Sequence, residues 1–353
     1  MNNTYPIFIA NDWTGVTRAE RVAGEWQITR ALGDTAIHCL ASDPHRPGSV
    51  YAGTRSDGVL RSDNAGLNWS PAGLEGVPVK SLAFDPSRPG VLYAGAKPVS
   101  LYATHDEAES WQELPALRAT RRWWWFSPAD PPGTTPYVQA VTVSPGDPDV
   151  ILAGIELGAV LRSEDGGRTW SNHRSGALRD CHSLKFHQTD PNRVFEGGGS
   201  GVGAAVSRDG GRTFSQPKAG LGRKYGWMIA SDPEKPDVWY LSASDQPRLL
   251  RGEFVPPAHN DGDARAHLYR SAGGGPWEKL KGGLPDPLDY MAYALVPDPN
   301  RTGHLYAGLA NGEVWFTADY GDSWERLPFN LGPIHRDLAI VFEGFPGKNL
   351  SEN

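Results

Sequence analysis

The chain has 353 residues, and its 41 acidic and 34 basic residues give a formal net charge of −7. This balance argues against a protein that binds nucleic acid by general charge attraction. The 42 glycines and 30 prolines indicate many turns, whereas the 13 tryptophans are too many for a disordered chain. Only two cysteines are present, which excludes a disulfide-rich scaffold and a cysteine-rich zinc domain.

The N-terminal region predicts neither a membrane helix nor a targeting segment. The first apolar run, Tyr5 to Ala10, contains Pro6 and follows no basic segment, so it does not have the form of a signal peptide. No stretch of the chain approaches the ~20 apolar residues of a membrane-spanning helix. We therefore expect a cytoplasmic protein that does not contact a membrane.

From residue 37 onward the chain repeats one plan. Each unit begins with a short apolar strand, passes a turn that usually contains Asp-Pro, continues with a strand of the Tyr-Ala-Gly type, and ends near Ser/Thr-x-Asp/Asn-x-Gly/Ala-x-x-Trp. The units span residues 37–69, 79–111, 138–170, 181–214, 225–277 and 291–324. Three or four short strands in roughly 43 residues are typical of a β-propeller blade.

The two ends of the chain predict one further blade. Trp26 stands one repeat length before Trp69, but its unit lacks a first strand, and residues 337–342 form an orphan strand after the last unit. Pairing residues 1–36 with 337–342 would close the ring and remove free sheet edges. The predicted fold is an all-β, seven-bladed propeller in which residues 1–353 form a single domain. The alternative is an open solenoid.

The motif that closes each unit has a local structural explanation. In its most complete copy, Ser163 to Trp170, the central acid is Asp165, and Asp209 and Asp319 are its equivalents. A short carboxylate can accept backbone N–H groups of its own turn, glycine permits positive φ, and an indole buries a large area. We interpret these aspartates as turn stabilisers rather than catalytic acids.

This motif resembles the Asp-box, or BNR, repeat of sialidase-like seven-bladed propellers, which also occurs in family 74 xyloglucanases, sortilin-type receptors and a photosystem II assembly factor. The resemblance covers nearly the whole chain and implies a glycosyl-hydrolase-like scaffold with the boxes on the face away from the binding site. The chain departs from true sialidases, because it lacks an Arg-Ile-Pro segment near its start and their arginine triad cannot be placed. A fold that hosts many activities does not select one.

Two insertions interrupt the repeat, at residues 112–137 and 244–267. The alignment of the units places both on the face opposite the Asp boxes, and loops on a rigid scaffold commonly carry function. The first insertion contains Arg122 and Trp124 within the run Arg121 to Phe126. These side chains are candidates for binding a sugar ring and an anion, with a hydrophobic plug as the alternative.

Aligning the units also shows two columns of polar residues near this upper face. The first, close to the start of each innermost strand, comprises His38, Lys80, Gln139, His182, Trp227 and Tyr293. These residues would form a polar ring at the channel mouth, either as a ligand site or as a solvated lining. The second column follows the middle strand and contains Arg55 and Glu156, while Tyr225 and Arg336 are further ligand-binding candidates on this face.

One blade carries an anomalous acid. Glu196 stands where four other units have alanine, as at Ala153. A buried carboxylate needs a partner or a shifted pKa, and Arg179 and His182 are the nearest candidates for a structural ion pair. Glycoside cleavage commonly uses two carboxyl groups about 5–10 Å apart. The candidate catalytic residues are therefore Glu196, Glu156 and Asp180.

No cofactor is predicted, and a metal site is not favoured, although His38, His182, Glu196 and His335 would approach one another near the axis. The glycines after Glu196 are not followed by the Gly-Lys-Ser/Thr of a phosphate-binding loop, and the histidines show no compact spacing of metal ligands. Cys39 and Cys181 are expected to be free thiols because the alignment places them in separate blades.

Two functions remain open. The first is a glycosyl-hydrolase-like propeller that binds, and as an enzyme would hydrolyse, a small or saccharide-like ligand at the channel mouth. The second is a propeller without catalysis that binds a protein partner or assists assembly. A deep pocket with a perturbed carboxylate favours the first, and a broad shallow surface favours the second.

Overall fold

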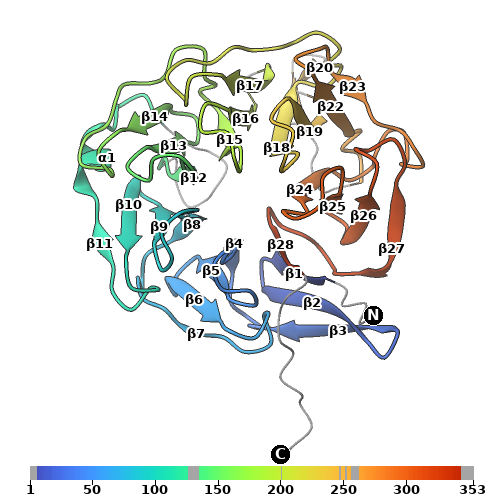
Figure 1. Ribbon diagram of the computed structural model, residues 1–353, viewed down its shortest axis with the longest axis horizontal. Helices are drawn as coiled ribbons and strands as arrows, with labels where there is room; N and C mark the ends of the chain where they lie inside the picture. Colours follow the sequence, from blue (N-terminus) through green and yellow to red (C-terminus); the bar gives the residue numbers. More distant parts are fainter. Residues whose placement is uncertain are drawn as a thin grey trace, which may run out of the picture.

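The computed structural model describes residues 6–125, 135–199, 201–245, 248–250, 253–255 and 262–342. Seven antiparallel sheets stand around a central axis (Figure 1), which confirms the predicted all-β propeller. Helix within the described part of the chain is limited to α1 (Pro115–Ala119).

The three blades that follow the N-terminal strands each run from the axis outward. Their strands are β4 (Ile37–Ser42), β5 (Val50–Thr54), β6 (Val59–Ser62) and β7 (Ser70–Pro71); β8 (Val79–Phe84), β9 (Leu92–Ala96), β10 (Ser100–Thr104) and β11 (Gln112–Glu113); and β12 (Val138–Val143), β13 (Ile151–Ile155) and β14 (Val160–Ser163). Middle strands β5, β9 and β13 are buried along their whole length. Neighbouring blades cover both of their faces, which explains their continuous apolar sequences.

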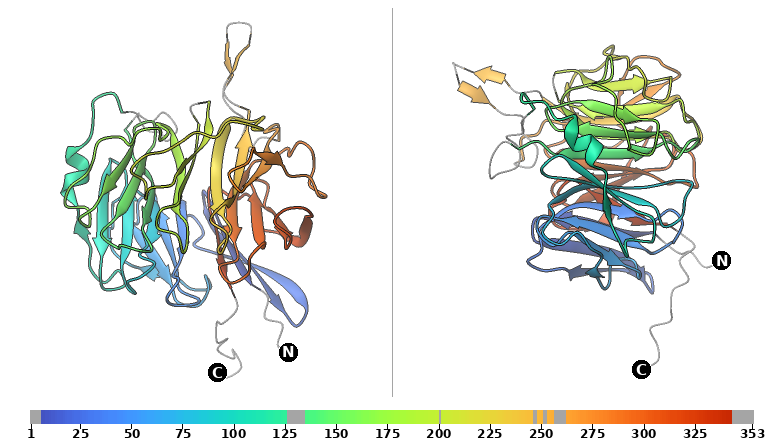
Figure 2. Two further views of the ribbon diagram at one scale, coloured as in Figure 1. Left: turned by 45° about the horizontal axis from the view of Figure 1, so that its top comes forward. Right: turned by 90° about the vertical axis from the view of Figure 1, so that its left-hand side faces the viewer.

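The next three blades follow the same order. Their strands are β15 (Cys181–Phe186), β16 (Val194–Gly198) and β17 (Gly203–Ser207); β18 (Tyr225–Ser231), β19 (Val238–Ser244), β22 (His267–Ala272) and β23 (Glu278–Lys279); and β24 (Ala292–Pro297), β25 (Leu305–Leu309), β26 (Glu313–Thr317) and β27 (Glu325–Asn330). A separate two-stranded sheet, β20 (Arg248–Leu250) with β21 (Glu253–Val255), projects from the ring (Figure 2).

The seventh blade joins the two ends of the chain. Strand β28 (Leu338–Val341) pairs with β1 (Ile7–Asp12), and β2 (Gly15–Val22) and β3 (Glu25–Ala31) complete the sheet. In the β1–β28 register Phe8 lies opposite Ile340 and Ile9 opposite Ala339. The closing pairing is therefore confirmed, and an open solenoid is excluded.

The repeated turns are held by their own polar side chains. In the turn after β14 the Gly167 N–H donates to Ser163 Oγ (2.8 Å), and the Thr169 N–H donates to Asp165 Oδ1 (2.9 Å). The Trp170 indole N–H donates to the Gly167 carbonyl (3.1 Å). Hydrogen bonds from Thr169 lower the pKa of Asp165 to about 2. The aspartate is thus kept ionised as an acceptor within the turn.

The two insertions are described in part. In the first, Leu117 of α1 and Trp125 are buried in the core of the neighbouring blades, whereas Trp123 is 91% exposed and Trp124 is 50% exposed. Trp125 therefore packs into the core as the hydrophobic plug, whereas Trp123 and Trp124 do not. Residues 126–134 and much of 246–261 lie outside the described residues, so a common face for both insertions stays a prediction.

Two further observations concern the whole described chain. Cys39 and Cys181 are buried free thiols, as expected. Among the helices that the structure describes, none has the length and apolarity to cross a membrane.

The buried hydroxyl of the turn motif can be tested at Ser163. Ser163→Ala leaves the Gly167 N–H without its acceptor, and an unsatisfied buried donor costs about 1–3 kcal/mol. We expect a loss of this size in the free energy of unfolding, measured by urea denaturation. Ser163→Thr is the matched control, because Thr104 and Thr317 supply the same hydroxyl in other blades. Equal stability of the alanine and threonine variants would contradict this account.

Candidate functional site

A β-bulge recurs at the same place in six of the blades and directs one side chain toward the axis. The register between inner and middle strands shifts at His38, Lys80, Gln139, His182 and Tyr293, each of which is the residue that the pairing skips. In the sixth case Trp227 and Met228 share the irregularity between β18 and β19. Bulges re-aim side chains, so these residues leave the ladder and gather at the start of the inner strands.

The seventh blade contributes Arg336, which precedes β28 and reaches across the channel. Its guanidinium donates to Gln139 Oε1 (2.7 Å) and to the Tyr137 hydroxyl (3.1 Å). It also lies 6.0 Å from the centre of the Trp227 ring. Arg336 therefore links the closing blade to the opposite side of the ring through neutral partners.

A cavity of about 170 Å³ lies along the axis, and its lining includes Lys80, Gln139, His182, Trp227 and Arg336. This volume is below the ~300–1,000 Å³ of common ligand pockets. The channel itself therefore has room for one small group or one terminal residue of a chain, and an extended ligand would remain outside it.

Histidine and lysine share a hydrogen bond on one side of the mouth. His38 donates from Nδ1 to the Val79 carbonyl (3.1 Å), and its Nε2 accepts from Lys80 Nζ (3.3 Å). Lys80 also lies 4.8 Å from the centre of the Tyr137 ring. This side of the mouth is consequently cationic, with Lys80 held between a neutral imidazole and an aromatic face.

Further aromatic rings lie around the mouth. The Trp227 ring lies 4.6 Å from His182 and 5.1 Å from Tyr293, measured between ring centres. Trp13, which is 46% exposed, stacks on His335 at 3.8 Å. These rings present apolar faces next to the polar side chains of the ring.

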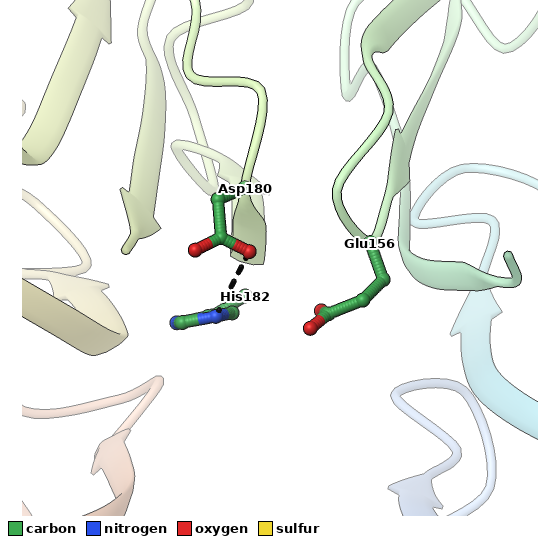
Figure 3. Close-up of side chains that lie close together, drawn as sticks. All are labelled: Glu156, Asp180 and His182. Carbon is green, nitrogen blue, oxygen red and sulfur yellow. Dashed lines mark ion pairs between the residues drawn. The ribbon is translucent and has the colours of Figure 1, made fainter. Parts of the chain in front are cut away.

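Glu156, Asp180 and His182 form a compact cluster (Figure 3). One ligand atom from each lies within 4.8 Å of the other two, and all three side chains are buried. His182 Nε2 lies 3.4 Å from Asp180 Oδ1. Glu156 comes from the turn after β13, whereas Asp180 and His182 flank the start of β15 in the next blade. The cluster thus spans the interface between two blades.

Burial and mutual charge shift the pKa values of this cluster. Burial raises the pKa of Glu156, and the Asp180 charge adds to the rise while His182 opposes it. For His182, burial disfavours the charged form, but the hydrogen bond with Asp180 and the Glu156 charge raise its pKa overall. Both shifts come from placing three ionisable groups together away from bulk water.

A glycine makes room for Asp180. A Cβ added to Gly199 would overlap Asp180 Oδ2, and the Gly199 N–H donates to the Asp180 carbonyl (3.0 Å). At the same position of the preceding blade the residue is Glu156, whose N–H donates to the Tyr137 carbonyl (3.2 Å). Gly199, in the glycine run after Glu196, therefore leaves space for the Asp180 carboxylate.

Glu196 lies apart from this cluster. Its side chain is fully buried, its Oε2 accepts from the Leu178 N–H (2.9 Å), and its Oε1 has no hydrogen-bond partner. The expected ion pair with Arg179 or His182 is wrong, because Arg179 donates to the Gly158 carbonyl and His182 contacts Asp180. Burial raises the pKa of Glu196 to about 8, so the folded protein holds it as a neutral acid at pH 7.

The other candidates from the sequence occupy different surroundings. Tyr225 stands beside the cluster, with its ring centre 5.0 Å from that of His182. Arg55 and Arg122 are exposed, and Arg122 donates to Asn172 Oδ1 (3.4 Å). Trp124 contacts Trp123 edge to face. The cavity lining thus contains four residues of the first column (Lys80, Gln139, His182 and Trp227) together with Arg336. Glu156, Asp180 and Tyr225 join this group through His182. Glu196, Arg55, Arg122 and Trp124 belong neither to this lining nor to the Glu156–Asp180–His182 cluster.

The sequence reasoning missed Tyr137 and Trp13. Tyr137 stands two residues before Gln139, as Asp180 does before His182 and Tyr225 before Trp227. Residues two apart point to the same side of a strand, so a third column at this offset could have identified it. Trp13 lies in the turn between β1 and β2 of the irregular closing blade and had no such signal.

No protein-family model matches the chain. Two curated proteins are similar in sequence: an oligoxyloglucan-reducing end-specific xyloglucanase from Emericella nidulans, 25% identical over 62% of this chain, and a probable one from Neosartorya fischeri, 30% identical over 58%. The matched regions are 26% and 25% of those proteins, so the chain spans about a quarter of their length.

Solved structures show the same architecture. The GH74 xyloglucanase of Xanthomonas campestris matches 82% of this chain and 45% of its own at a TM-score of 0.59 and 18% identity. YCF48 bound to D1 peptide matches 86% of this chain and 96% of its own at a TM-score of 0.52 and 13% identity. At these identities the likeness concerns the fold. The chain is a seven-bladed propeller with xyloglucanases among its sequence relatives and GH74 enzymes among its structural neighbours.

The buried acid Glu196 predicts a pH-dependent stability. Its folded-state pKa of about 8 exceeds the ordinary value of 4.5, so unfolding releases its proton between these values. The free energy of unfolding should therefore fall as the pH rises from about 5 to about 8, by at most about 1.4 kcal/mol per pH unit. Glu196→Gln should reduce this slope, measured by urea denaturation across the range.

Glu75→Gln is the control for that measurement, because Glu75 is exposed. It should leave the slope of the parent protein unchanged. A Glu196→Gln protein with the parent's slope would show that Glu196 is already ionised in the fold.

Proposed function

We propose that this protein is a glycoside-hydrolase-like propeller that binds the end of a saccharide at the mouth of its central channel. The observation that carries the proposal is the composition of that mouth. Aromatic rings of Trp13 and Trp227 lie beside hydrogen-bonding side chains of Lys80, Gln139 and Arg336. Sugars combine apolar ring faces with hydroxyl groups, and a site of this kind offers a partner for each.

The comparisons support a saccharide as the ligand class. The curated relatives are named as xyloglucanases, and their similarity covers more than half of this chain. The turn motif, with its Ser or Thr hydroxyl, its Asp or Asn acceptor and its indole, is the pattern that we assign to the Asp-box repeat. The small channel cavity favours recognition of one terminal sugar, with the remainder of the chain outside.

Hydrolysis of the bound saccharide would use Glu156 and Asp180. Their carboxylate oxygens lie within 4.8 Å, close to the about 5–5.5 Å that separates the two carboxyl groups in retaining glycosidases. Glu196 takes no part in this proposal, because it is enclosed within its blade.

A second candidate function is recognition of a protein segment. The observation that favours it is the match to YCF48, which covers 96% of that single-propeller chain, and that structure contains a D1 peptide. Exposed Trp123 and Trp124 would then serve as contact residues outside the channel. The two functions differ in which tryptophans the ligand needs.

The tryptophans provide the test. We expect Trp227→Ala to weaken binding of xyloglucan oligosaccharides about tenfold or more, because a lost ring contact and its burial are together worth about 1.4 kcal/mol. Binding is measured by isothermal titration calorimetry, and released reducing ends are assayed in parallel. Trp123→Ala is the matched control and should bind as the parent does, since Trp123 is 91% exposed and is not among the described residues that line the cavity.

Other results would reject the proposal. If a panel of neutral and acidic oligosaccharides shows no binding to the parent protein, saccharide recognition at this mouth fails. If Trp123→Ala and Trp124→Ala abolish capture of a peptide while Trp227→Ala does not, the second function replaces it.

A further inference from the structure

The cluster of Glu156, Asp180 and His182 directs two carboxylates and one imidazole toward a common point. The His182 Nδ1–H donates to the Gly226 carbonyl (2.7 Å), because a carbonyl can only accept. In the neutral imidazole the lone pair on Nε2 then faces Asp180 Oδ1 at 3.4 Å. Either a proton on Nε2 or a metal ion bound to both atoms resolves this contact between two acceptors.

Glu156 adds a third acceptor to the same point. Its side chain is only 5% exposed, and its carboxylate accepts no hydrogen bond from any residue that the structure describes. Figure 3 shows this carboxylate directed across the blade interface toward His182 and Asp180. The charges of Arg336 and Lys80 also act on Glu156, but a divalent cation at the common point would contact all three groups directly.

The distances suit a metal ion of the first transition row. Ligand atoms placed about 2.0–2.2 Å from a tetrahedral zinc ion are about 3.4 Å apart, which equals the His182–Asp180 separation. The Glu156 oxygen lies within 4.8 Å of both and needs a small side-chain rotation to complete the set. An imidazole with two carboxylates is a donor set that Zn²⁺ and Mn²⁺ accept, whereas Ca²⁺ prefers six or more oxygens.

The surroundings hold the ligand atoms in place. The backbone carbonyl of Gly226 fixes the tautomer of His182, as the outer partners of metal-bound histidines commonly do. The rings of Tyr225 and Trp227 lie 5.0 and 4.6 Å from the imidazole, centre to centre. Gly199 leaves the space that Asp180 needs. These contacts prepare the cluster without occupying its centre.

We propose that Glu156, Asp180 and His182 bind one Zn²⁺ or Mn²⁺ ion between two blades at the channel mouth. Three protein ligands leave coordination positions open, as in sites where a metal meets water or a ligand. With the ion bound, Glu156 and Asp180 serve as ligands and are not available as the catalytic carboxyl pair. Hydrolysis by these two groups alone would therefore require the metal-free protein. The proposal does not rest on saccharide binding.

The test uses the full chain, stripped of metal with a chelator and titrated with Zn²⁺, Mn²⁺ and Ca²⁺ separately in calorimetry, without any saccharide. We expect one equivalent of Zn²⁺ or Mn²⁺ to bind, with Ca²⁺ at least tenfold weaker. Glu156→Gln and Asp180→Asn should each weaken binding at least tenfold. Glu196→Gln is the matched control, since it also converts a buried acid of the same region into an amide, and should bind as the parent does.

A spectroscopic measurement needs no variant and so remains valid where a substitution prevents folding. Mn²⁺ bound to the parent protein should show, in pulsed electron paramagnetic resonance, coupling to one imidazole nitrogen. Three results would overturn the proposal: no stoichiometric binding by the stripped parent, unchanged affinity in both Glu156→Gln and Asp180→Asn, or a bound Mn²⁺ ion without nitrogen coupling. Because no saccharide is present, these results leave saccharide binding to its own test.

Discussion

The pairing of β28 with β1 is the interaction on which the rest of this structure depends. Without it, the sheet of β1, β2 and β3 would have no hydrogen bonds to the end of the chain that completes the ring. Placing β28 innermost in this sheet ties both ends of the chain into one blade. It also brings Arg336 and Asp337 to the axis, where the Asp337 carboxylate accepts from the Leu40 N–H (3.2 Å) and Arg336 reaches Gln139. Closure of the ring and completion of the channel mouth are therefore the same event.

Within the closed ring, repetition supplies a frame and local irregularity supplies chemistry. The buried middle strands and the hydroxyl–carboxylate turns recur in several blades with nearly the same hydrogen bonds. The bulges recur as well, but each presents a different side chain to the axis. A symmetric scaffold thereby builds an asymmetric mouth, because the cations Lys80 and Arg336, the acidic cluster and Trp227 come from different blades.

The arrangement of acids illustrates how position decides role. Asp165 in an exposed turn is held ionised by Thr169, with its pKa lowered to about 2. Glu196, enclosed between strands with one oxygen unpaired, has its pKa raised to about 8. Glu156 is buried too, yet it faces other ionisable groups across a blade interface. Of these three acids, only Glu156 is both buried and close to the ionisable side chains of Asp180 and His182.

The sequence by itself determined the fold, the number of blades, the terminal closure and the column from His38 to Tyr293, because strand length, turn residues and repeat spacing are local properties that recur along the chain. It also named Glu156, Asp180 and Arg336, but it ranked Glu196 with them, since an alanine-to-glutamate exchange marks an anomaly without saying which way the side chain points. The tertiary structure alone decided that Glu196 stays inside its blade, that Tyr137 and Trp13 join the mouth, and that Glu156 meets the start of the next blade. Those outcomes depend on how side chains are directed and on contacts between residues of different blades. The angle between neighbouring blades sets such contacts, and no repeating sequence pattern encodes that angle.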